Sequence, residues 1–101
     1  MNEKYSWCLI VEGWIDRMRQ GTISQEESFR LERLLIRARL RGCSATLDDM
    51  IELFMDPRKT RREIVEKLHS FADHGEITMA DFREVSAMAP GNTQRRGQEI
   101  R

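Results

Sequence analysis

The chain has 101 residues, enough for one domain with a single modest hydrophobic core. Lysine and arginine together number 17, and so do aspartate and glutamate, which gives no net charge. This balance argues against a strong overall attraction to nucleic acid or to an anionic membrane. Apolar residues make up 40% of the chain and charged residues 34%, as in a folded soluble domain. Electrostatic recognition must therefore depend on local patches.

The chain contains two cysteines, Cys8 and Cys43, too few to indicate a disulfide scaffold. We therefore expect two buried thiols and a cytoplasmic protein. Residues 5–15 are largely apolar, but Glu12 interrupts them and Asp16 follows. The segment is also too short to cross a bilayer, so the sequence predicts neither a signal peptide nor a membrane span.

The first predicted helix covers residues 5–19, where apolar side chains recur at helical spacing and form one stripe. Trp7 and Trp14 belong to this stripe and are expected to anchor the core. Gly21 follows as the left-handed residue that ends the helix.

The second predicted helix runs from Ser24 to Arg41, before Gly42, and has apolar residues on two of its sides. One side contains Leu31, Leu34, Leu35 and Ala38. The other side contains Phe29, Ile36 and Leu40. Between the two sides runs an arginine stripe of Arg30, Arg33, Arg37 and Arg41. A helix with two apolar sides usually packs against two neighbours, so this helix is predicted to be central.

Three more helices are predicted over residues 46–56, 60–74 and 78–89. Each starts with a threonine and has an acidic residue three positions later, which is the pattern of a capping box. A serine and a glutamate form the same pattern at the start of the second helix. No segment alternates apolar and polar residues over a useful length, so no strand is predicted.

The sequence therefore predicts an all-α fold, a compact bundle of about five short helices. We expect residues 1–89 to form a single helical domain. Residues 90–101 lack any apolar pattern, so we expect them to form a flexible tail.

The last two predicted helices resemble a known module. Leu68, the Gly-Glu-Ile-Thr segment at residues 75–78, and Asp81-Phe82 are similar to the short helical hairpin at the ends of many bacterial proteins, the SHOCT type. This resemblance covers a small part of the chain and implies only a helical hairpin with an interaction role.

The sequence lacks the residue patterns of an active site. His69 and His74 lie five positions apart, on different sides of a helix, and neither has a cysteine at metal-ligand spacing. No glycine-rich phosphate loop occurs. We therefore expect no enzymatic activity, no metal site and no cofactor.

Two charge ladders occur on neighbouring predicted helices. The second predicted helix carries the arginine stripe, and the third carries an acidic ladder of Asp48, Glu52 and Asp56. The turn between these two helices is short, which predicts that they are antiparallel neighbours. The expected pairs are Arg41 with Asp48, Arg37 with Glu52 and Arg33 with Asp56. Such exposed pairs contribute only about 0–1 kcal/mol each. In the alternative, both ladders face outward as complementary binding patches.

A second basic cluster covers residues 58–62 and contains Arg58, Lys59, Arg61 and Arg62. Cations at the start of a helix oppose its dipole. In one interpretation these side chains lie beside Asp56 and Glu63. In the other they contact a phosphate or an acidic protein surface.

In size, single domain, lack of catalytic groups and patchy charge, the chain resembles the small inhibitors encoded by phages and mobile elements, anti-CRISPR proteins among them. This resemblance implies a non-catalytic protein that blocks a host nucleoprotein complex by occupying the surface of one subunit. The expected contact residues are Arg30, Arg33, Arg37, Arg41, Arg58, Lys59, Arg61 and Arg62.

The alternative function is a small DNA-binding transcriptional regulator that uses Arg33, Arg37 and the 58–62 cluster, although nucleic acid is the less favoured partner. A homodimer is a further alternative, because the second helix carries more apolar surface than one small core covers.

Overall fold

The computed structural model describes residues 3–88 of the chain. A single 3-10 turn at Glu3–Tyr5 precedes five α-helices. The helices are α1 (Ser6–Gln20), α2 (Gln25–Leu40), α3 (Leu47–Met55), α4 (Arg61–Asp73) and α5 (Met79–Ser86). Residues 3–88 contain no strand, so the all-α prediction is confirmed. The tail predicted at residues 90–101 lies outside the described residues.

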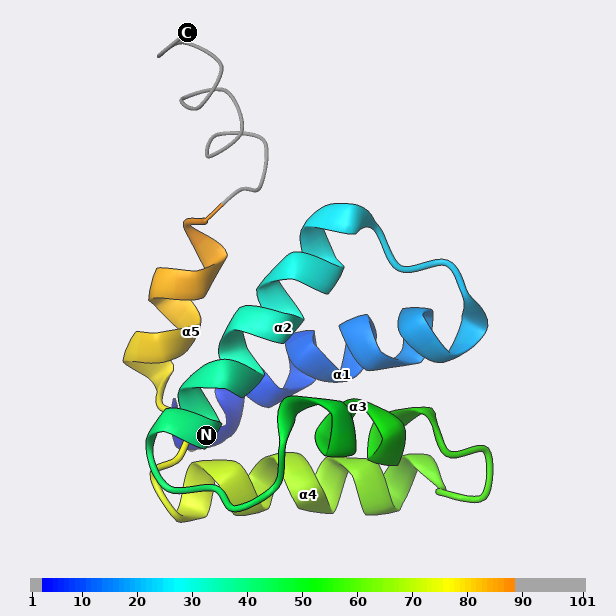
Figure 1. The fold of residues 1–101 in the computed structure, drawn as a ribbon. Coiled ribbons are helices and arrows are strands. Elements are labelled where there is room, and N and C mark those ends of the chain that lie inside the picture. Colours follow the sequence, from blue (N-terminus) through cyan, green and yellow to red (C-terminus); the bar gives the residue numbers. More distant parts are fainter. Residues whose placement is uncertain (1–2, 89–101) are drawn as a thin grey trace, which may run out of the picture.

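Helix α2 contacts α1, α3 and α5, which agrees with the prediction that it is central. In Figure 1, α5 stands beside α2, while α3 and α4 lie below it and α1 lies behind. Helix α1 is still more central, because it contacts all four of the other α-helices. The sequence did not indicate this role, since α1 has only one strongly apolar stripe.

The core forms around the two tryptophans, as predicted: Trp7 and Trp14 are only 1% and 4% exposed. The other fully buried large side chains include Leu34, Leu35, Phe54, Leu68 and Phe71. They come from α2, α3 and α4, so the core joins the helices into one unit. The indole Nε1 of Trp7 is buried and has no hydrogen-bond partner among the described residues.

Both cysteines are free thiols, as expected, but only Cys8 is buried. Burial raises the pKa of the Cys8 thiol to about 12, and the nearby Glu12 carboxylate adds to the effect. Because the thiolate is the reactive form, Cys8 is an inert core residue at neutral pH. Cys43 is half-buried after α2.

Four of the five helices start at the residues that the capping pattern indicated. Ser24, Thr46 and Thr78 each form a complete capping box with the acidic residue three positions later. At Thr60 only one of the two hydrogen bonds of the predicted capping box forms. The Thr60 hydroxyl accepts from the Glu63 N–H, but the Glu63 carboxylate lies 3.7 Å from the Lys59 ammonium instead of returning to the cap.

Two arginines that the sequence analysis did not single out fix α1 to its neighbours. Arg17 holds the Glu27 carboxylate through two hydrogen bonds, of 3.0 Å from Nε and 2.8 Å from Nη2. Arg19 donates to the backbone carbonyls of Phe54, at 2.6 Å, and Lys59, at 2.9 Å. These contacts hold the ends of α2, α3 and α4 against one end of α1.

The turns after α1 and α4 have the same construction. Gly21 and Gly75 both adopt left-handed backbone conformations, with φ of 78° and 70°. In each turn, the next two backbone N–H groups donate to a single carbonyl in the last turn of the helix, that of Arg17 or Phe71. Residues 21–24 (Gly-Thr-Ile-Ser) and 75–78 (Gly-Glu-Ile-Thr) share the pattern Gly-x-Ile-Ser/Thr, which therefore encodes one repeated connection. After the second copy, the chain leads into α5, which packs against α2 and α1.

The left-handed glycines provide a matched test with Gly13, which lies inside α1. Gly75→Ala is expected to lower the free energy of unfolding by about 1 kcal/mol, because a Cβ atom is strained at positive φ. Gly13→Ala is expected to raise it by about 0.5–1 kcal/mol, because alanine favours helix and its Cβ would meet the Arg17 side chain at an ordinary 3.4 Å. Urea unfolding of both variants measures the two changes. Equal signs would contradict the expectation.

Candidate functional site

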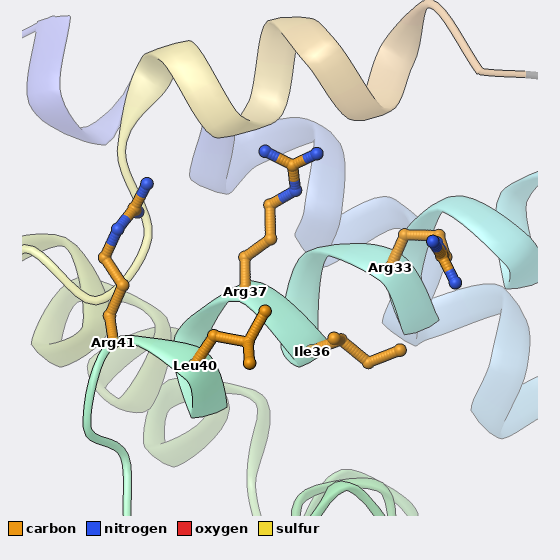
Figure 2. Close-up of a pocket in the computed structure, with 5 residues that line it drawn as sticks. All are labelled: Arg33, Ile36, Arg37, Leu40 and Arg41. Carbon is orange, nitrogen blue, oxygen red and sulfur yellow. The ribbon is translucent and has the colours of Figure 1, made fainter.

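The arginine stripe of α2 reaches toward α5, as Figure 2 shows for Arg37 and Arg41. Arg41 binds both carboxylate oxygens of Asp81, with Nη2 at 2.8 Å from one of them. Arg37 lies 3.4 Å from the same carboxylate and also pairs with Glu84. The expected pairing with the acidic ladder of α3 is therefore wrong.

The geometry of α3 explains the error. Asp48 and Glu52 lie on the side of α3 opposite the buried Met50 and Phe54, so they point away from the rest of the domain. Within residues 3–88, neither carboxylate forms an ion pair. Asp48 and Glu52 therefore face outward, as the alternative interpretation of the acidic ladder expected. Asp56 differs, because Arg58 binds it at 3.2 Å.

Asp81 is the buried end of the contact between α2 and α5, with only 2% of its surface exposed. Its carboxylate accepts hydrogen bonds from the Thr78 backbone N–H at 2.8 Å and the Thr78 hydroxyl at 3.1 Å, besides those from Arg41. Burial alone would raise the pKa of Asp81, but the hydrogen bonds from Arg41 and Thr78 outweigh it and lower the pKa to about 2. Asp81 is therefore ionised at any physiological pH.

The sequence identified Asp81 only as part of a capping box. A carboxylate in that position can cap its own helix with one oxygen and bind a distant arginine with the other. Arg41 and Asp81 are 40 residues apart in the chain. No local pattern therefore links them.

The 58–62 cluster is also paired within the domain. Arg58 and Lys59 lie beside Asp56 and Glu63, which confirms the first of the two interpretations for these side chains. The remaining pairs are Arg61 with Asp16 at 3.1 Å and Glu12 at 3.3 Å, and Arg62 with Glu66 at 3.6 Å. Arg61 was not expected to reach α1, where it neutralises the buried Glu12 carboxylate.

Arg33 differs from the other predicted contact residues. Arg30 lies 3.7 Å from Glu26 and donates to the Met88 carbonyl, so seven of the eight have an acidic partner. Among residues 3–88, Arg33 forms no ion pair. Its guanidinium carbon lies 5.8 Å from the centre of the Phe29 ring, a cation–π contact that leaves its N–H donors available.

The outer face of α2, by which we mean Phe29, Arg33, Ile36 and Leu40, lies opposite the buried side of this helix. The two apolar sides of this helix predict that Phe29, Ile36 and Leu40 pack against a second neighbour. That expectation is wrong for Leu40, whose surface is 80% exposed. Phe29 and Ile36 are half-buried.

A shallow pocket of about 230 Å³ adjoins this face. Its lining residues come from α2 and from the C-cap residue of this helix: Arg33, Ile36, Arg37, Leu40 and Arg41. Figure 2 shows Ile36 and Leu40 along the near side of the helix, while the guanidinium groups of Arg37 and Arg41 point away from them toward α5. This surface therefore presents aliphatic side chains beside cations, and it can contact an apolar group that carries a carboxylate nearby.

The described part of the chain, residues 3–88, contains no group of three histidine, cysteine or acidic side chains placed to hold a metal ion. None of its helices is long and apolar enough to span a membrane. His69 stacks on the Tyr5 ring, with 4.3 Å between the ring centres, and so has a packing role. Comparison with protein-family models, curated proteins and solved structures finds no match to this chain.

Proposed function

We propose that the protein is a non-catalytic, cytoplasmic binding protein that acts by covering an acidic surface of another protein with the outer face of α2. One observation carries the proposal: Leu40 is 80% exposed beside Arg33, whose guanidinium has no acidic partner within residues 3–88. An exposed aliphatic side chain and a guanidinium that has no acidic partner can together contact a surface that offers apolar groups and carboxylates.

The other predicted arginines have a supporting role in this proposal. Arg37 and Arg41 line the pocket and are already held by ion pairs to α5. Side chains that are ordered before binding lose little conformational entropy when the partner binds. In keeping with the resemblance to small phage inhibitors, we propose that the partner is a subunit of a large host nucleoprotein complex, blocked by steric occupation.

Leu40→Glu tests this surface, with Leu9→Glu as the matched control. Leu9 is 65% exposed on α1, so both variants place a glutamate on an exposed helix position. We expect immobilised wild-type protein and the Leu9 variant to retain the same large complex from a bacterial lysate. The Leu40 variant should lose it, since the new carboxylate repels an acidic partner. Equal retention by both variants would show that this face is not the contact site.

The alternative is a DNA-binding regulator, and the exposure of the 58–62 cluster favours it. The side chains of Arg58 and Arg62 are both 88% exposed, and their ion pairs are weak surface pairs. Fluorescence anisotropy with duplex DNA across a salt series separates the two functions. A DNA-binding protein would lose affinity steeply as salt rises. We expect no binding even at low salt.

A further inference from the structure

The pocket on α2 has the arrangement that receives a side chain from a facing helix. Four of its residues, Arg33, Ile36, Arg37 and Leu40, have the spacing i, i+3, i+4 and i+7. In knobs-into-holes packing, four residues of one helix form the hole for one side chain of the next. The residues of the outer face, Phe29, Arg33, Ile36 and Leu40, are separated by four, three and four residues. The same alternation of three and four is typical of the contact side of a helix that packs against another helix. The shape thus fits another helix (Figure 2).

The charge of the hole restricts which helix can fit. Arg37 is neutralised by α5, but Arg33 is not neutralised within residues 3–88. Leu40 offers an apolar contact, because most of its surface is exposed. The facing helix must therefore carry an exposed apolar side chain with carboxylates one or two turns away on the same side.

Helix α3 of this protein has this composition. Asp48, Glu52 and Met55 are separated by four and three residues, so they share one side of the helix. Met55 is 43% exposed, and neither carboxylate forms an ion pair within residues 3–88. A helix joined to α2 by a short connection cannot turn this outer side onto α2 of its own chain, since its inner side is held in the core by Met50 and Phe54.

We propose that two copies of the chain associate through these surfaces, with the outer face of α2 on the Asp48–Glu52–Met55 side of the partner's α3. Because α2 and α3 are adjacent in each copy, a two-fold axis forms both contacts at once. Pairing of α2 with the partner's α2 is disfavoured, because it would bring Arg33 near the partner's Arg33. The dimer covers the surface assigned above to the partner protein, so that protein must displace the second copy.

The proposal is tested by reversing one charge on each face. Sedimentation equilibrium from micromolar to millimolar concentration then measures the mass of the wild type and of each variant. The wild-type protein is expected to approach twice the chain mass of 11.9 kDa. Arg33→Glu and Glu52→Arg should each weaken self-association about tenfold or more, because each places like charges in contact. An equimolar mixture of the two variants should associate again, since both contacts of the mixed dimer then join opposite charges.

Glu66→Arg serves as the control for Glu52→Arg. Glu66 is an exposed glutamate on α4, a helix that contributes to neither face, and its reversal should leave self-association unchanged. Leu40→Gln, which adds no charge, should also weaken the dimer. Circular dichroism verifies that every variant is folded. A monomeric wild type at millimolar concentration, or a mixture that stays monomeric, would overturn the proposal. So would equal weakening by Glu66→Arg.

Discussion

Asp81→Asn is expected to lower the free energy of unfolding by about 2 kcal/mol at neutral pH. The pKa of Asp81 is about 2 in the folded protein, against an ordinary value of 3.8. Each unit of difference corresponds to about 1.4 kcal/mol. We use about 2 kcal/mol because the Arg41 side chain is 43% exposed, so water screens part of the interaction.

The same substitution is expected to change the response to acid. A carboxylate with a lowered pKa stabilises the fold fully above its ordinary pKa, and this contribution is lost as the pH falls toward its folded pKa. For Asp81 that range extends from roughly pH 5 to pH 2. The difference in stability between wild type and Asp81→Asn should therefore shrink across this range, as measured by urea unfolding at several pH values.

Glu32→Gln provides the control for Asp81→Asn. Glu32 is exposed on α2 and forms no ion pair within residues 3–88, so its change to an amide should alter stability by less than about 0.5 kcal/mol at any pH. A constant difference between wild type and Asp81→Asn from neutral to acidic pH would show that the Asp81 carboxylate is not held in its charged form.

Phe54→Ala is expected to have the largest effect, a loss of about 4 kcal/mol in the free energy of unfolding. The Phe54 side chain is completely buried, and α3 has only nine residues with which to hold its place. Met50 is the only other fully buried side chain of this helix. The loss is large against the total stability of about 5–15 kcal/mol for a domain of this kind.

Leu9→Ala removes the same kind of side-chain bulk from an exposed position and should cost less than about 0.5 kcal/mol. Hydrogen exchange adds a local readout, because α3 should lose protection in the Phe54 variant before α1 does. A cost below about 2 kcal/mol for Phe54→Ala would mean that α3 does not depend on this anchor.

The limits of the helices follow from the sequence because short-range chemistry decides them. Ser24 and Thr46 satisfy backbone N–H groups only three residues away, and Gly75 adopts a conformation that other residues avoid. Trp7 and Trp14 lie on one side of a helix in any fold that forms α1. These features require no knowledge of distant contacts.

The partners of the arginine stripe were decided only by the tertiary structure. Arg41 had an acidic ladder closer in sequence, yet it binds Asp81, because α3 presents its carboxylates outward and α5 places a buried carboxylate against α2. The exposure of Leu40 likewise depends on which side of α2 its neighbours cover. Helical periodicity specifies the face on which a side chain lies, whereas the packing of distant helices determines what that face contacts.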